Sequence, residues 1–88
     1  MKKIKIIKGH ITQRDGDKIL IFDAEKSLLY TFNGTATFIF DRMKKGVDLK
    51  KIVEGLTEEF SVTHDQAKKD AYEFARTLIA KGLAKEEK

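Results

Sequence analysis

The chain has 88 residues, which is the size of one small domain. It contains no Cys and only two His, which excludes a disulfide framework and a thiolate metal site and leaves too few ligands for a histidine site. No apolar run approaches the length of a membrane span or a signal peptide, so we expect a cytoplasmic protein with no membrane partner. We also expect no metal and no cofactor.

The net charge of +4 is unevenly distributed along the sequence. Residues 1–18 carry six Lys or Arg against two Asp, whereas the remaining residues carry twelve basic and twelve acidic side chains. The whole excess of positive charge therefore lies in the first 18 residues, and the part with helical patterns has none.

The first third of the chain predicts β structure. Residues 1–8, in which Lys and Ile partly alternate, are expected to form a basic arm or an edge strand. Asp15-Gly16 then predicts a type I′ hairpin turn between strands 10–14 and 18–23, with Arg14 opposite Asp17 and Ile11 opposite Leu20.

A third strand is predicted over 27–32, after a polar turn. Residues 9–32 would then form a three-stranded antiparallel sheet. Its strands carry apolar residues on both faces, although such a sheet in a small domain normally has one solvated face. We expect the helices to cover one face, and the N-terminal arm, a partner or a second subunit to cover the other.

Residues 33–84 predict three short helices. Asn33 is the expected N-cap of the first, which ends at Gly46. Asp48 is the expected N-cap of the second, whose stripe of apolar residues ends near Phe60.

The third helix is predicted to start with a reciprocal capping box formed by Thr63 and Gln66 and to end at Gly82-Leu83. Residues 85–88 are expected to be a frayed tail. The predicted fold of residues 1–88 is one α+β domain that is winged-helix-like: a three-stranded antiparallel sheet followed by a three-helix bundle that contains a helix-turn-helix.

The third helix carries two apolar stripes. The core stripe contains Ala67, Ala71, Phe74 and Leu78, and a neighbouring stripe contains Lys68, Tyr72, Ala75 and Ile79. The second stripe either completes the core or forms one wall of a groove. In that case Ala75 is its floor, and its rim consists of Lys68, Lys69 and Arg76.

The third strand can supply the other wall, because no later strand is predicted to pair with it. A free strand edge beside an apolar helix face is typical of peptide binding by strand addition. The residues concerned are Leu28, Leu29, Tyr30, Thr31 and Phe32. The same edge also favours dimerisation or strand swapping.

The junction between the third strand and the first helix resembles that of the PqqD-like family. The stretch 32–39, Phe-Asn-Gly-Thr-Ala-Thr-Phe-Ile, matches the family pattern, with Phe where Leu is usual. The resemblance covers about residues 18–84. It continues through Gly46, Ile52, Leu56, Phe60, Asp70, Phe74, Leu78, Gly82 and Leu83.

Proteins of this family are the peptide-binding modules called RiPP recognition elements. The resemblance implies a three-strand, three-helix fold without catalytic activity. It also implies that the leader segment of a precursor peptide docks against the third strand beside the third helix, between residues 28–32 and Lys68, Lys69, Tyr72, Arg76 and Ile79. The implied second partner is a peptide-modifying enzyme such as a radical SAM maturase or a lasso-type protease or cyclase.

Two other functions fit part of the sequence. A DNA-binding winged helix suits the fold and the basic pI, but residues 63–81 carry four basic and three acidic side chains, which is a poor match to phosphate. We therefore expect no nucleic-acid partner. A structural dimerisation module would cover the free edge with a second copy, and the sequence leaves a monomer and a strand-swapped homodimer open.

Overall fold

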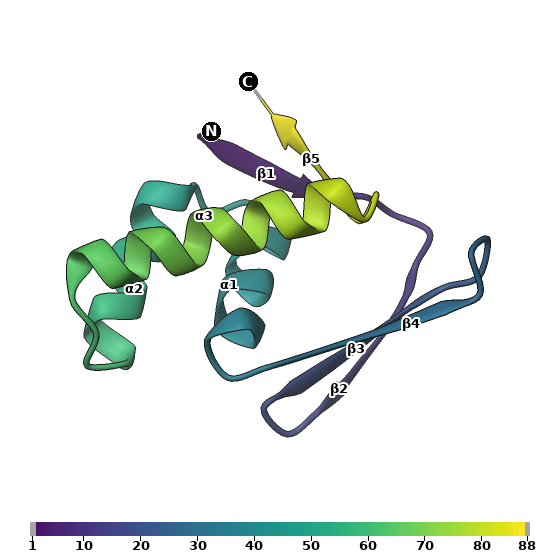
Figure 1. Ribbon diagram of the computed structural model, residues 1–88, viewed down its shortest axis with the longest axis horizontal. Coiled ribbons are helices and arrows are strands. Elements are labelled where there is room, and N and C mark those ends of the chain that lie inside the picture. Colours follow the sequence, from purple (N-terminus) through teal and green to yellow (C-terminus); the bar gives the residue numbers. More distant parts are fainter. Residues whose placement is uncertain (1, 88) are drawn as a thin grey trace.

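The computed structural model describes residues 2–87, which fold into three helices and five strands (Figure 1). In chain order these elements are β1 (Lys3–Ile6), β2 (Ile11–Asp15), β3 (Lys18–Asp23), β4 (Leu28–Asn33), α1 (Thr35–Lys44), α2 (Leu49–Glu59), α3 (His64–Ala80) and β5 (Ala84–Glu87).

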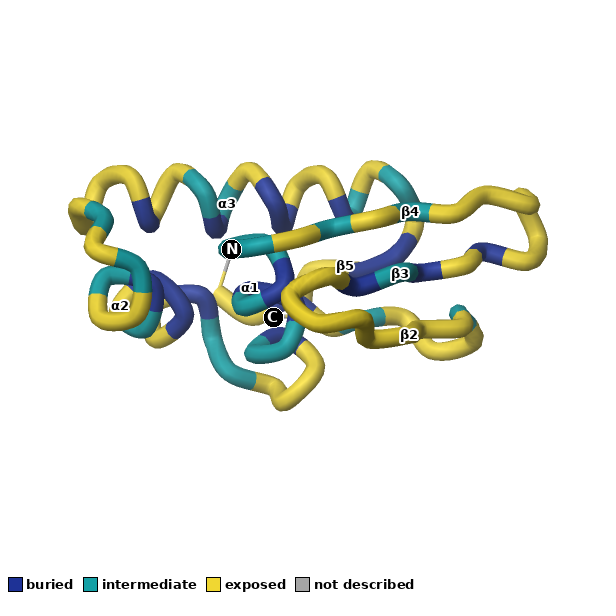
Figure 2. Tube along the Cα trace, turned by 90° about the horizontal axis from the view of Figure 1, so that it is seen from below, coloured by how far each residue is buried: buried dark blue, intermediate teal, exposed yellow. Residues whose placement is uncertain are grey.

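The predicted three-stranded antiparallel sheet is confirmed, in the order β2-β3-β4. Figure 2 shows α3, β4, β3 and β2 in that order across the molecule. The strand nearest α3 is therefore β4, and β2 is the opposite edge of the sheet. The α+β fold with three helices after the sheet is likewise as predicted.

The predicted turn of the first hairpin is one residue too early, which shifts every predicted cross-strand partner by two residues. Asp15 pairs with Lys18, so Ile11 lies opposite Phe22 rather than Leu20. Gly16 has φ of 63°, and Asp17 is not among the positive-φ residues. A positive φ at the first central position alone is typical of a type II′ turn, which places Gly there, whereas type I′ needs it at both positions.

The two faces of the sheet differ in burial. Ile19 and Ile21 are each 2% exposed and face the helices. On the other face, Ile11, Phe22 and Leu29 lie opposite one another across three strands and are 65%, 37% and 62% exposed. Within the described part of the chain this apolar row has no cover, so the N-terminal arm does not cover the second face.

The two ends of the described chain form a second sheet. β1 and β5 pair antiparallel, from Lys3 opposite Glu87 to Ile6 opposite Ala84 (Figure 1). The expected frayed tail is therefore wrong for residues 85–87, and Lys88 lies outside the described residues. The sequence of β5 is mostly charged, so pairing with β1, rather than intrinsic propensity, makes it a strand.

The predicted N-cap of α1 is also wrong. Asn33 is the last residue of β4 and pairs with Lys18, so the cap position falls on Gly34, which has φ of 59° and no side-chain cap bond. Two residues into the helix, the buried Thr37 hydroxyl donates to the Asp17 carbonyl at 2.6 Å. This bond fixes the start of α1 against the β2–β3 turn.

The caps of the other two helices follow the sequence more closely. The Asp48 carboxylate accepts from the Lys51 N–H at 2.9 Å, as predicted for α2. At α3 the Thr63 hydroxyl accepts from the Gln66 N–H at 3.1 Å, but the Gln66 side chain donates to Asp70 instead of returning to the cap. Half of the predicted capping box is therefore present.

The end of α3 is as predicted. Gly82 has φ of 75° and its N–H donates to the Ile79 carbonyl, while the Leu83 N–H donates to the Leu78 carbonyl. These two bonds define a Schellman motif. The buried Leu83 then directs the chain into β5, which lies beside α3.

Candidate functional site

The edge of β4 that faces away from β3 is a row of free backbone groups. Among the described strands, β3 is the one partner of β4. The two-residue turn before β3 places Lys18 opposite Asp15, so we infer that the Lys18 N–H donates to the Asp15 carbonyl. Successive residues of β3 then direct their N–H and C=O groups alternately toward β2 and toward β4. Ile21 then bonds to Tyr30, which leaves the N–H and C=O groups of Leu29 and Thr31 directed at the open edge.

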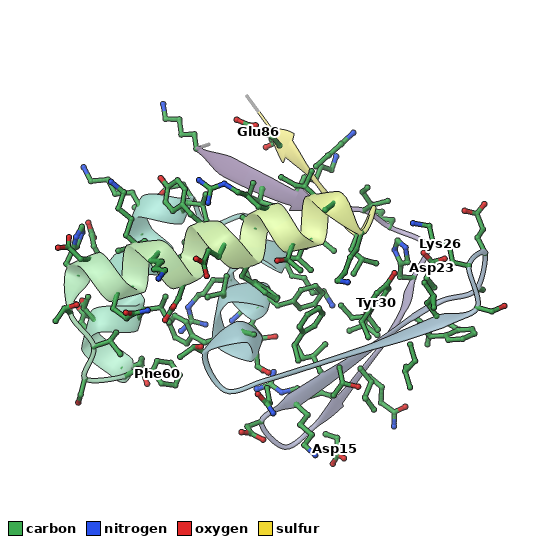
Figure 3. The ribbon with its side chains drawn as sticks, viewed as in Figure 1. Asp15, Asp23, Lys26, Tyr30, Phe60 and Glu86 are labelled. Carbon is green, nitrogen blue, oxygen red and sulfur yellow. The ribbon has the colours of Figure 1, made fainter. Side chains whose placement is uncertain are left out.

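The inward side chains of β4 reach α3. The rings of Phe32 and Phe74 meet edge to face, with centroids 4.9 Å apart and an interplanar angle of 85°. Further along the strand, the Lys81 ammonium lies 5.1 Å from the centre of the Tyr30 ring. Figure 3 shows Tyr30 between β4 and the C-terminal end of α3. These contacts define the floor that joins the open edge of β4 to the helix.

One end of this floor is closed by the β3–β4 turn. The Lys26 ammonium donates to the Lys81 carbonyl at 3.1 Å, and the Lys26 N–H donates to the Asp23 carboxylate at 3.3 Å (Figure 3). Asp23 also lies 3.7 Å from the His10 ring. The turn is thereby held against the end of α3, which fixes the position of β4 relative to the helix.

We call the β4 edge, Tyr30, Phe32, Phe74 and Lys81 together the β4–α3 groove. The side chain of Leu28, which is 46% exposed, lies on the same face of the sheet as Tyr30 and Phe32, whereas the exposed side chains of Leu29 and Thr31 lie on the opposite face. The groove thus offers strand hydrogen bonds, apolar side chains and one cation. This combination of groups is typical of sites that recognise an extended polypeptide by strand addition.

The expected α3 residues lie elsewhere on the helix. Lys68 and Tyr72 line a separate hollow of about 290 Å³ together with Lys50, Val53 and His64, on the side of α2. Ala75 is fully buried, so it is inaccessible as a groove floor, and Ile79 is half-buried. Lys69 and Arg76 are exposed. The structure therefore brings the β4 residues together with Phe74 and Lys81 rather than with this stripe.

Sequence reasoning placed Phe74 in the core and gave Lys81 no role at the site. Phe74 is 9% exposed, so it is a core residue that also faces β4. The one indication in the sequence was that Phe74 is the aromatic residue of the core stripe. The sequence alone did not indicate which side of α3 faces the sheet.

Some other kinds of site have no counterpart in the described residues. Within 2–87, no three His, Cys, Asp or Glu side chains cluster in a way that could hold a metal ion. No helix in that range combines the length and hydrophobicity needed to cross a bilayer.

Comparison with known proteins identifies the family of the chain. The family model for coenzyme PQQ synthesis protein D (PqqD) matches residues 18–84, which is most of the chain. The chain belongs to the PqqD family. The match begins at β3 and ends at the first residue of β5, so β1 and β2 lie outside the part that defines the PqqD family.

Two solved structures share the whole fold of this PqqD-family chain. One is TbiB1 in complex with the TbiA(beta) leader peptide, and the other is lasso peptide synthetase B1 complexed with the leader peptide. Each is 19% identical in sequence to this chain and superposes on it with a TM-score of 0.87. Both matches cover 96% of this chain, and they cover 98% of the first structure's chain and 99% of the second's. No curated protein sequence matches significantly.

Proposed function

We propose that this protein binds the leader segment of a ribosomally made precursor peptide and presents it to a separate modifying enzyme. The leader lies in the β4–α3 groove as an added strand. The observation that carries the proposal is the open edge of β4 beside α3, with Leu29 and Thr31 directing their backbone groups outward.

The family and its structural neighbours support this proposal. Both similar structures are complexes with a leader peptide, and their folds match this chain over nearly its full length. Membership of the PqqD family supports a role in peptide maturation as a binding protein rather than as the catalyst. The modifying enzyme is then a second protein, of radical SAM or of protease or cyclase type.

The chemistry of the groove indicates what it recognises. Main-chain bonds to Leu29 and Thr31 give affinity for any extended segment. Side chains of the leader that point inward contact Tyr30, Phe32 and Phe74, which favours apolar residues at alternate positions. Lys81, a half-buried cation against the Tyr30 ring, favours an acidic group nearby.

The first experiment is an amide NMR titration of the isotope-labelled protein with the leader half of a small peptide encoded beside its gene. Saturable shifts along 28–33 and in the second half of α3 are expected. An absence of shifts with that leader, combined with shifts at the N-terminal strands and the first turn of α3 on adding duplex DNA, would instead establish the DNA-binding alternative.

The Thr31→Pro variant tests strand addition directly. Proline has no N–H, so it removes one outward donor from the β4 edge without removing a bond to β3. We expect the affinity for the leader to fall by about tenfold or more, since a lost buried hydrogen bond and a blocked strand register act together.

The matched control is Thr31→Val, which keeps the N–H and the shape of the side chain. It should bind the leader within about twofold of the unaltered protein, because exposed substitutions have small effects. Amide spectra of both variants report whether β3 and β4 remain paired. Equal affinity of a folded Thr31→Pro variant would rule out binding along this edge.

A further inference from the structure

A hollow beside β1 lies away from the β4–α3 groove and has no role in the proposed function. Its volume is about 530 Å³, and a continuous run from Lys3 to His10 lines one side of it. Thr12 of β2, Ile21 of β3, the C-terminal end of α1, Leu83 and Glu87 line the rest. Because β2 and β4 are opposite edges of the sheet, a molecule in this hollow leaves the β4 edge free (Figure 2).

Most of the charged side chains that line this hollow are lysines. Its lining includes one acidic residue, Glu87, and five lysines: Lys3, Lys5, Lys8, Lys44 and Lys45. Residues from two distant parts of the sequence therefore place five lysines and one carboxylate around one concavity, which we call the basic pocket.

The charged side chains of the basic pocket are open to solvent, whereas its base is apolar. All five lysines are exposed, and Ile21, Phe40 and Met43 beneath them are at most 2% exposed. Ile7, which is 36% exposed, is an apolar side chain within reach of a ligand. The pocket thus suits a group that carries several negative charges and a smaller apolar portion.

The spacing of the lysines favours an extended polypeptide. Lys3 and Lys5 occupy alternate positions of β1, which places them about 7 Å apart at about 3.3 Å per residue. An extended acidic segment repeats its side chains at the same interval. β5 is the one strand partner of β1 in the described chain, so the second edge of β1 also offers main-chain groups.

We propose that the basic pocket docks an acidic segment of the protein that acts on the bound peptide. Carboxylates of that segment pair with the lysines, and an apolar side chain contacts Ile7. The identity of this partner rests on the function proposed above. Since the two sites lie at opposite edges of one sheet, the leader and the enzyme bind at the same time.

The test uses the labelled full chain and a short synthetic peptide that alternates Glu with Leu. Saturable amide shifts are expected at residues 3–10 and 44–46, with an affinity that falls as salt is added. The control peptide alternates Gln with Leu and should bind at least about tenfold more weakly, because it keeps the apolar pattern without charge.

Paired variants locate the charge. Lys5→Glu combined with Lys44→Glu should weaken binding of the acidic peptide by about tenfold or more and should create affinity for a peptide that alternates Lys with Leu. The matched control, Lys50→Glu with Lys51→Glu, reverses two exposed lysines of α2 outside the pocket and should change affinity by less than about twofold.

Three outcomes overturn the proposal: equal affinity for the Glu and Gln peptides, shifts confined to the β4–α3 groove, or tighter binding of a single-stranded oligonucleotide of the same charge. The leader titration in the same samples separates the two proposals. If the leader still binds along 28–33 while the pocket fails these tests, only the docking site is wrong. If the leader does not bind, the proposed function is wrong.

Discussion

At the scale of single residues, Tyr30 and Tyr72 present contrasting environments. Tyr30 lies on β4 under the Lys81 ammonium, whereas Tyr72 lines the hollow between α2 and α3. The sequence predicts that both bind peptide, Tyr30 because it lies on the free strand edge and Tyr72 because it lies on the second stripe of the third helix. The structure separates them, which allows the two faces of α3 to be tested independently.

Tyr30→Ala should weaken leader binding by about 1–3 kcal/mol, as is usual for the loss of an aromatic residue at an interface. Tyr72→Ala tests the face predicted from the sequence, and we expect it to leave the leader affinity within about twofold if the β4–α3 groove is the site. Isothermal titration calorimetry on both variants gives the comparison. A larger loss for Tyr72→Ala than for Tyr30→Ala would place the leader on the α2 side of the helix.

At the scale of elements, the sequence predicted well those features that depend on local chemistry. The strand 18–23, the Asp48 cap and the Gly82-Leu83 end of α3 all follow from residues close together in the chain. Each of these features depends on the backbone conformation of a few neighbouring residues or on a side chain that bonds within one helical turn. The local sequence pattern is therefore enough to predict them.

The features that the sequence did not predict depend on distant parts of the chain. β5 is a strand because β1 lies beside it, and nothing in Ala84–Glu87 favours that conformation. The side of α3 that faces the sheet likewise depends on a distant part of the chain, β4. Apolar residues flank its core stripe on the Tyr72 side, yet the contacts to β4 come from Phe74 and Lys81.

Gly82→Ala tests the end of α3. A Cβ at φ of 75° is unfavourable, so we expect the free energy of unfolding to fall by about 1–2 kcal/mol. Gly82→Asn should cost less, because Asn tolerates this conformation better. Urea unfolding of the two variants measures the difference, and an alanine variant as stable as the unaltered protein would show that the motif does not constrain the fold.

At the scale of the whole molecule, the pairing of β1 with β5 joins the first and last described elements. Ile4 is 2% exposed beneath this ribbon, and the Leu49 N–H donates to the Lys2 carbonyl at 2.9 Å. The ribbon therefore connects both ends of the chain to the helices and also carries one side of the basic pocket.

Removal of residues 85–88 should release β1. We expect the amide protons of Lys3 and Lys5, which face β5 in the register set by the Ile7 N–H to Leu83 carbonyl bond, to lose protection against hydrogen exchange, whereas those of Ile19 and Ile21 in β3 keep it, because the main sheet is a separate ladder. Replacing the same residues with others of strong β propensity is the control. Persistent protection of β1 after truncation would mean that α1 and α2 hold it without β5.

The same ribbon has a consequence during protein synthesis. β1 is made before all the other described elements, and its strand partner β5 is made after them. Until then the lysine-rich N-terminal segment remains unpaired, and Ile4 has no closed core to enter. The sheet and the first helices can form before β5 is made, but the basic pocket is completed only after β5 has left the ribosome and paired with β1.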